Sequence, residues 1–295
     1  MILSKSKKNY EIIINILLII ITLAMVLPLV LLFMSSITDE NTLVANGYSF
    51  FPEKLSLYAY EYILQNHATI FRAYAITIFV TVIGTFTSLI ITSLVAFPLS
   101  LKELPGRRVI MFYVFFTMLF SGGLVPSYIM WTTIFHIKNT IFAYLLPNFL
   151  MSAFNVILVR TFFTTSIPNE LYEAAKIDGA TYPKIYIKMV MPLSKPILVT
   201  IGLFTGLGYW NDWTNGLYYI SNRKMLSIQA LLNIMIQDIQ ALAANSTADS
   251  GSLLKIPQVS IRMAIAFVAV LPILIIYPFL QKYFASGIML GAVKG

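Results

Sequence analysis

A compact group of charged side chains interrupts two long apolar runs in the segment NELYEAAKIDGATYPK, residues 169–184. Glu170, Glu173 and Asp178 stand here among Lys176 and Lys184, and the segment contains no histidine or cysteine. Carboxylates and ammonium groups without such partners are suited to ion pairs rather than to nucleophilic or metal chemistry. The segment is therefore expected to contact either another protein surface or the lipid headgroups.

Catalytic motifs are not found elsewhere in the sequence. The two histidines, His67 and His136, lack metal-ligand spacing, and the chain has no cysteine. No GxSxG, HExxH or phosphate-binding glycine-rich lysine loop occurs. We expect a chain that is not an enzyme, has no catalytic residue and binds no metal or cofactor itself.

The composition predicts a membrane protein. The chain has 295 residues, of which 58% are hydrophobic and 11% are charged, against about 25% charged in soluble domains. Its formal net charge of +8 comes from basic residues that lie between apolar runs, which favours contact with lipid headgroups over nucleic acid. The first run follows Lys5, Lys7 and Lys8 and is too long for a signal-peptide core, so we expect an uncleaved span.

The apolar runs are long enough for six membrane-spanning helices. A bilayer core of about 30 Å needs about 20 apolar helical residues, and lipid leaves helices as the fitting structure for such runs. The expected fold is one all-α membrane domain over residues 1–295, with spans at about 12–34, 73–101, 109–133, 139–163, 196–220 and 263–284. SGGLVPS breaks the third run, as a hinge or as the end of a span before an outer helix. In the fifth, Gly202 and Gly206 have the GxxxG spacing that permits close helix packing.

The distribution of basic residues predicts the orientation. With the N-terminus inside, 13 of the 20 Lys and Arg residues lie on the inner side. The positive-inside rule then places both termini and the loop 165–195 in the cytoplasm. The outer loops are residues 37–71 and 221–261.

Helix signals organise the charged segment. Hydroxyl residues before Pro168 can cap a helix that has this proline in its first turn, and Gly179 supplies a left-handed stop after about 11 residues. A second short helix is expected from Thr181 to about Val190. The product is a helix–turn–helix outside the membrane, which either contacts another protein or rests on the headgroups as an amphipathic connector.

The same segment resembles the EAA loop of binding-protein-dependent ABC importer permeases. The matching positions are Glu173, Ala174, Ala175, Asp178, Gly179, Ala180 and Pro192. Four other stretches resemble the carbohydrate-uptake branch, which includes the second maltose permease: AFPLSLKELPGRR at 96–108, FFTMLFSGGLVPSYI at 115–129, YWNDW at 209–213 and SGIMLGAVKG at 286–295. The second of them is typical of oligosaccharide and polysaccharide-fragment permeases.

The resemblance implies partners for the chain. It implies a second, non-identical permease, two cytoplasmic ABC ATPase subunits that use ATP and Mg, and an extracellular or periplasmic sugar-binding protein. The EAA helix would dock on an ATPase, with Glu173 meeting a basic group. The tail Gly291, Ala292, Val293, Lys294 and Gly295 would contact the ATPases, or it is a frayed end. The localisation implied is the bacterial cell membrane.

Two sets of polar side chains are candidates for the path of a sugar. Tyr209, Trp210, Asn211, Asp212 and Asn215 follow the fifth apolar run, and Tyr128 lies in the third. Aromatic rings can stack on sugars, and Asn and Asp can bind hydroxyls. The alternative is an aromatic belt at the membrane interface with Asp212 near water.

Two other transport functions compete with sugar import. One is ATP-driven import of a different solute. The other is a self-sufficient secondary transporter, which would be expected to carry ionisable residues in the middle of its spans. Spans one to four and six have none there, and this pattern favours the importer.

Overall fold

The computed structural model describes residues 5–65, 67–147, 149–245 and 259–292. Helices dominate these residues, and their one extended pairing is an isolated bridge between Thr38 and Leu55. The chain divides into two compact units, one formed by residues 1–70 and 234–272 and the other by 71–233 and 273–295. The predicted all-α class is confirmed for the described residues.

The first unit contains α1 (Lys5–Ser36), α2 (Glu40–Asn46) and α3 (Tyr58–Gln65) with the first part of α15 (Val259–Ala292). The Ser36 hydroxyl lies 2.7 Å from the Tyr60 hydroxyl and so joins α1 to α3. The Glu40 carboxylate accepts hydrogen bonds from the backbone N–H groups of Val259 and Ser260, at 2.9 and 2.8 Å. A carboxylate at this position satisfies free donors and the positive end of α15.

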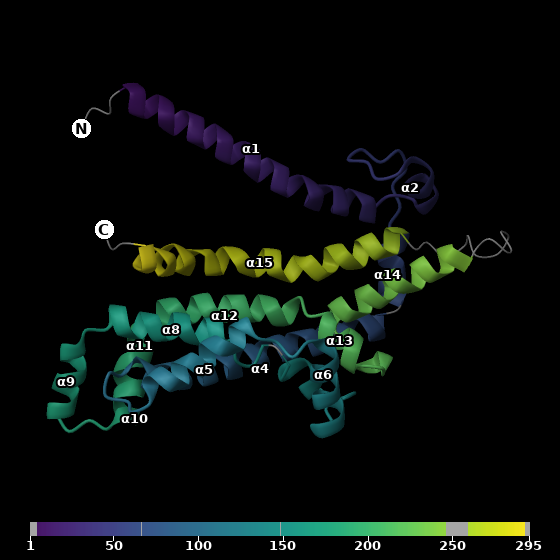
Figure 1. Ribbon diagram of the computed structural model, residues 1–295. Helices are drawn as coiled ribbons and strands as arrows, with labels where there is room; N and C mark the ends of the chain where they lie inside the picture. Colours follow the sequence, from purple (N-terminus) through teal and green to yellow (C-terminus); the bar gives the residue numbers. More distant parts are fainter. Residues whose placement is uncertain (1–4, 66, 148, 246–258, 293–295) are drawn as a thin grey trace. The chain divides into compact units, whose positions relative to one another are not determined.

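The second unit holds most of the remaining helices (Figure 1). In chain order they are α4 (His67–Ser100), α5 (Arg107–Leu119), α6 (Leu124–Ile129), η1 (Met130–Ile134), α7 (Phe142–Leu145), α8 (Ala153–Ser166), α9 (Asn169–Ile177), α10 (Tyr182–Ile185), η2 (Tyr186–Val190), α11 (Met191–Leu193), α12 (Lys195–Trp210), α13 (Thr214–Tyr219) and η3 (Arg223–Met225). Helix α14 (Ile228–Asn245) begins in the second unit and continues in the first unit from Ile234. Helix α8 packs on α5 and α12. Helices α9 and α10 lie at one end of this unit, and α6 and α13 lie at the other (Figure 1).

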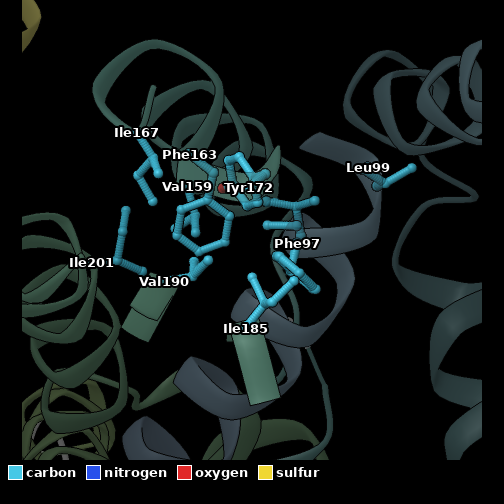
Figure 2. Packing of buried hydrophobic residues seen from close by; sticks show 11 residues of the cluster. Phe97, Leu99, Val159, Phe163, Ile167, Tyr172, Ile185, Val190 and Ile201 are labelled. Atoms are coloured by element: carbon cyan, nitrogen blue, oxygen red, sulfur yellow. The ribbon is translucent and has the colours of Figure 1, made fainter. Parts of the chain in front are cut away.

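A cluster of buried apolar side chains joins α4, α8, α9, α10 and α12 (Figure 2). Its members include Phe97 from α4, Val159 and Phe163 from α8, Ile185 from α10 and Ile201 from α12. Each is less than 8% exposed, so this cluster supplies the core on which the site described below rests.

The two glycines of the fifth predicted span face α4. A Cβ at Gly202 would lie 3.2 Å from Leu89 Cδ1, and one at Gly206 would lie 3.3 Å from Thr85 Oγ1. The GxxxG pair therefore permits the close approach of α12 to α4, as the spacing predicts.

Three described helices are long and apolar enough to cross a membrane, or five segments if each of two bent pairs forms one span. The third predicted span is interrupted: α5 ends at Leu119, and after Gly122 and Gly123 the chain continues in α6 and η1 at 112° to it. This angle favours a helix end followed by a separate helix over a hinge within one helix. Gly123 has φ +85°, a conformation that glycine adopts readily.

The fourth predicted span, 139–163, is also not one helix. It consists of α7, a non-helical stretch that includes Pro147, and α8, which begins at Ala153. Proline lacks an N–H and restricts the residue before it, so an apolar run containing Pro147 does not continue as a helix there.

The fifth predicted span contains α12, which ends at Trp210. The helical segment before it, Tyr182–Leu193, makes an angle of 79° with α12.

Candidate functional site

The charged segment forms a short helix, α9, with a defined start. Pro168 precedes it as the N-cap with ψ 140°, and no side chain caps the helix. The expected hydroxyl cap is wrong, because Thr164 and Thr165 belong to the end of α8 and donate their hydroxyl hydrogens to the carbonyls of Arg160 and Thr161. Helix α9 has 9 residues, with Glu170 in its first turn, where a carboxylate is favourable.

The end of α9 follows the prediction. Gly179 has φ +72°, and its N–H donates to the Lys176 carbonyl at 3.0 Å, while the Ala180 N–H donates to the Ala175 carbonyl at 2.9 Å. These two bonds form a Schellman motif, which requires a left-handed residue and so favours glycine. The helix therefore stops sharply, and Thr181 opens the second helical arm as the N-cap of α10.

One side of α9 is attached to the core, and the other is exposed. Tyr172 is 8% exposed and belongs to the buried cluster (Figure 2). Ala175 packs against this cluster. Glu173 and Ala174 are exposed, and Ile177 has 86% of its surface exposed. A helix attached along one side and offering an exposed carboxylate beside two apolar side chains is a suitable surface for a protein partner.

An ion pair ties α9 to the loop between α4 and α5. The Lys176 ammonium donates to the Glu103 carboxylate at 2.7 Å, and the Tyr182 hydroxyl donates to the same carboxylate at 2.8 Å. The Lys176 ammonium also lies 5.3 Å from the centre of the Tyr182 ring. We call Glu103, Lys176 and Tyr182 the clasp.

The hydrogen bonds of the clasp stabilise the charged forms of Glu103 and Lys176. The hydrogen bonds from Lys176 and Tyr182 lower the pKa of the Glu103 carboxyl, and the bond to Glu103 raises the pKa of the Lys176 ammonium. Both groups are thus charged at neutral pH. Because they are exposed, solvent weakens the pair, and the clasp positions α9 rather than adding much to stability.

Sequence reasoning missed the clasp and Tyr172. Glu103 is separated from Lys176 by 73 positions, and no local pattern reports such a pairing. A signal for Glu103 was its position as the one acidic residue in the basic loop LKELPGRR. The signal for Tyr172 was its large aromatic ring, three positions before Ala175 and therefore on the same side of the helix.

The motif residues differ in their placement. Glu173, Ala174, Ala175, Asp178, Gly179 and Ala180 lie on one helix and its stop, with Asp178 exposed and Ala180 against the core. Pro192 lies apart in α11 and is exposed, just before the chain bends into α12. Six of the seven motif residues therefore share one helix and its C-terminal stop, and the seventh, Pro192, lies at the later bend before α12.

The polar residues after α12 form a second, buried region. The Asn215 backbone N–H and side-chain amide donate to the two Asp212 carboxylate oxygens at 3.0 and 2.8 Å. The Ser227 hydroxyl donates to the Asp212 carbonyl at 3.2 Å, and the Ser227 N–H donates to the Tyr144 hydroxyl at 3.0 Å. We call Tyr144, Asp212, Asn215 and Ser227 the Asp212 cluster; all four are buried.

The remaining path candidates are less uniform. The Tyr209 hydroxyl donates to the Leu145 carbonyl at 2.9 Å, and both Tyr209 and Trp210 are buried. Tyr128 is half-buried and stacks on Tyr219 with 5.8 Å between ring centres, whereas Asn211 is exposed. Burial within the chain gives Tyr209, Trp210, Asp212 and Asn215 packing partners and leaves Asn211 and Tyr128 with accessible surface.

The C-terminal tail is described only in part. Gly291 and Ala292 are the last residues of α15. Val293, Lys294 and Gly295 lie outside the described residues, so a contact of this tail with ATPases stays a prediction. Among the described residues, no group of three or more His, Asp or Glu side chains could hold a metal ion.

Related proteins match almost the whole length of the chain. A permease protein of the polygalacturonan/rhamnogalacturonan transport system from Bacillus subtilis, YtcP, is 37% identical over 278 residues, covering 94% of this chain and 96% of its own. The protein LplC from the same organism is 35% identical over 272 residues, 92% of this chain and 90% of its own.

A solved structure matches as well. It is the crystal structure of a bacterial ABC transporter involved in the import of the acidic polysaccharide alginate, and one of its chains is 31% identical with a TM-score of 0.79. The match covers 96% of this chain and 99% of that one. Residues 88–289 also match a family profile, and the chain belongs to that family, the binding-protein-dependent transport system inner membrane components.

Proposed function

We propose that the chain is the permease subunit of an ATP-driven importer and forms half of the translocation path for an oligosaccharide. An extracellular or periplasmic binding protein delivers the sugar. Support for a sugar comes from relatives named for polygalacturonan and rhamnogalacturonan transport and for melibiose, raffinose and stachyose import. Acidic fragments are the first to test, because alginate is the acidic substrate of the structural relative.

Helix α9 carries the proposal. Its outward face, with Glu173, Ala174 and Ile177, docks on a cytoplasmic ATPase, and Glu173 meets a basic group there. A sharply stopped helix held by the Tyr172 ring moves as one body, whereas a flexible loop would absorb the motion of the ATPase. Tyr172 packs with residues of α4, α8 and α12, and these contacts pass the motion to the membrane segments.

Membership of the family supports the partners proposed next. Two ABC ATPase subunits hydrolyse ATP with Mg in the cytoplasm, and a second, non-identical permease supplies the other half of the path. Helix α1 supports such a complex, since none of its most apolar 18-residue window is buried within this chain. Lipid and a second permease would cover its surface. The tail 291–295 is proposed to reach the ATPases.

The membrane arrangement proposed has six spans with both termini and loop 165–195 in the cytoplasm. The third of these spans is then α5, which ends before the separate outer helix formed by α6 and η1. The fourth is composite, α7 followed by α8. Support comes from the concentration of basic residues on that side and from the position of α9 and α6 at opposite ends of the second unit (Figure 1).

For the path itself we propose a division of roles. Asn211 and Tyr128 have accessible surface and would contact the sugar. Tyr209, Trp210, Asp212 and Asn215 would hold the wall behind them, because their side chains are buried.

The test is ATP hydrolysis by the assembled complex in vesicles, with the binding protein and a panel of acidic and neutral oligosaccharides. We expect at least one saccharide to stimulate hydrolysis. No response to any saccharide would remove sugar as the substrate and leave an importer of another solute. Uptake driven by an ion gradient without ATP would contradict the importer and favour a secondary transporter.

A further inference from the structure

A half-open groove of about 590 Å³ lies beside the C-terminal end of α4. One wall is the end of α4 and the loop after it, and the other is the helical arm formed by α10 and η2. The lining residues are Leu94, Phe97, Pro98, Leu101, Glu103, Leu104, Pro105, Tyr182, Pro183, Tyr186 and Ile187. The volume lies within the range of small-molecule sites in proteins.

The polar groups of the groove are already hydrogen-bonded. The Tyr186 hydroxyl lies 2.7 Å from the Ser93 hydroxyl, which leaves the Tyr186 ring as an apolar wall beside Phe97. Glu103 accepts from Lys176 and Tyr182 within the clasp. A peptide segment in this groove would leave its own backbone groups without partners, which is costly, so the groove fits a hydrocarbon chain.

The groove lies at the depth of lipid headgroups. Helix α4 is apolar and long enough to span a membrane up to Ser100, and the next eight residues include Lys102, Glu103, Arg107 and Arg108. A change from apolar to charged residues marks the interface between the hydrocarbon core and water. An acyl chain in the groove would therefore have its headgroup at this loop.

The charge of the loop selects the headgroup. Glu103 is neutralised by Lys176, and among the described residues Lys102, Arg107 and Arg108 make no ion pair with a carboxylate. One guanidinium nitrogen of Arg107 donates to the carbonyl of the lining residue Leu101 at 3.3 Å, which holds this positive charge at the edge of the groove. Basic residues at a membrane surface attract anionic lipid headgroups.

We propose that this groove binds one acyl chain of an anionic phospholipid, with the lipid phosphate on the basic loop that follows α4. The bound lipid lies against the clasp and thus beside the attachment of α9. The proposal rests on the position of α4 in the membrane and not on the docking of an ATPase, so either can fail without the other.

The test uses the complete transporter in vesicles and an added tryptophan, Ile187→Trp, at the 63% exposed edge of the groove. Phosphatidylglycerol and phosphatidylcholine, each with brominated acyl chains, are compared as quenchers, after subtraction of the signal from the chain's own tryptophans. We expect stronger quenching by the anionic lipid. The double variant Lys102→Gln/Arg108→Gln should reduce this preference by up to about thirtyfold, since each basic residue near the surface adds about a fivefold attraction.

The control is Phe86→Trp, on the 64% exposed surface of α4 far from the basic loop, where neither lipid should be preferred. Equal preference at both positions would overturn the proposal, as would the absence of quenching at position 187, which would mean that protein covers the groove. Lipid retained by the purified wild-type complex gives a second readout by mass spectrometry. We expect an anionic phospholipid that the Lys102→Gln/Arg108→Gln complex loses, and retention by both complexes would contradict the proposed site.

Discussion

Helix α9 and the Asp212 cluster are both polar regions in an apolar chain, but they use polarity in opposite ways. In the cluster, the Asp212 carboxylate accepts two bonds from Asn215, and the residues are buried. In α9, one ring is buried, and Glu173 stands exposed beside Ile177. Internally paired groups hold a fold together, whereas exposed groups on a rigid support are available to a partner.

The comparison changes the meaning of the two sequence patterns. YWNDW and NELYEAAKIDGATYPK both look like functional polar segments in the sequence. The structure gives the first of them internal partners for Tyr209 and Asp212 and gives the second an attached inner side with a free outer side. Substitutions in the cluster should therefore act on stability, and substitutions on the outer side of α9 should act on coupling.

The largest effect is expected from Glu173→Arg. Reversing this charge places two positive groups together if the ATPase offers a basic partner, and like-charge contact across an interface costs several kcal/mol. Transport and substrate-stimulated ATP hydrolysis should fall by more than about tenfold, with unchanged expression and melting temperature. Glu170→Arg is the control for a charge change in the same helix. Normal transport by the Glu173→Arg complex would show that this face is not the docking surface.

Asp212→Ala should have the next largest effect, and on stability. The change leaves two donors of Asn215 without an acceptor in a buried place, and an unsatisfied buried group costs about 1–3 kcal/mol. The melting temperature of the purified complex should fall. Asp178→Ala, an exposed aspartate, should change stability by less than about 0.5 kcal/mol, and equal losses from the two variants would remove the contrast between the regions.

Gly179→Ala should weaken coupling by a smaller amount. Left-handed backbone costs a non-glycine residue about 1–2 kcal/mol, and the strain falls on the Schellman motif that ends α9. Gly47→Ala is a stringent control, because Gly47 has φ +76° and ψ −166°, which strains an alanine at least as strongly, and has open space where a Cβ would lie. We expect reduced transport per ATP for Gly179→Ala alone. The same loss from Gly47→Ala would point to general strain instead of a lever.

The clasp should give the smallest change. An exposed ion pair contributes about 0.2–1 kcal/mol, so Glu103→Gln or Lys176→Gln should reduce coupling by at most about fivefold. The single charge reversals Glu103→Lys and Lys176→Glu should each reduce coupling, and the double exchange Glu103→Lys/Lys176→Glu should restore much of it. If the double exchange couples no better than either single reversal, the pair has no positioning role.

The same pair predicts a pH dependence. The pKa of Glu103 is lowered in the folded chain. The stabilisation that the Glu103 carboxylate provides through the ion pair is therefore complete above the usual glutamate pKa and is lost as the pH falls through the lowered value. The raised pKa of Lys176 means that the pair is lost on the alkaline side only as the pH rises through that value. Coupling should thus be flat around neutral pH in the wild type.

Local signals in the sequence predicted the parts of the fold that depend on neighbouring residues. Gly179 ends α9, Thr181 opens the next helix, and Gly202 and Gly206 face α4. The hydroxyl cap of α9 was wrong because Thr164 and Thr165 were already used by α8. A count of apolar residues also could not show that Pro147 divides the fourth run.

Parts that depend on distant residues were not predictable. The clasp joins Glu103 to Lys176, and the Asp212 cluster joins Ser227 to Tyr144 across 83 positions. Neither pairing has a periodicity, and each arises only when the packed helices bring separate loops together.

The most direct test of the docking surface uses the absence of cysteine from the chain. A single cysteine at Ala174 is labelled with a photoactivatable thiol reagent in the assembled complex and illuminated, and a single cysteine at the 89% exposed Phe51 is the control in the proposed outer loop. We predict that position 174 cross-links to an ATPase subunit and is labelled only from the cytoplasmic side, while position 51 does neither. Cross-links from position 174 only to lipid, or labelling of that position from outside the cell, would contradict α9 as the coupling surface.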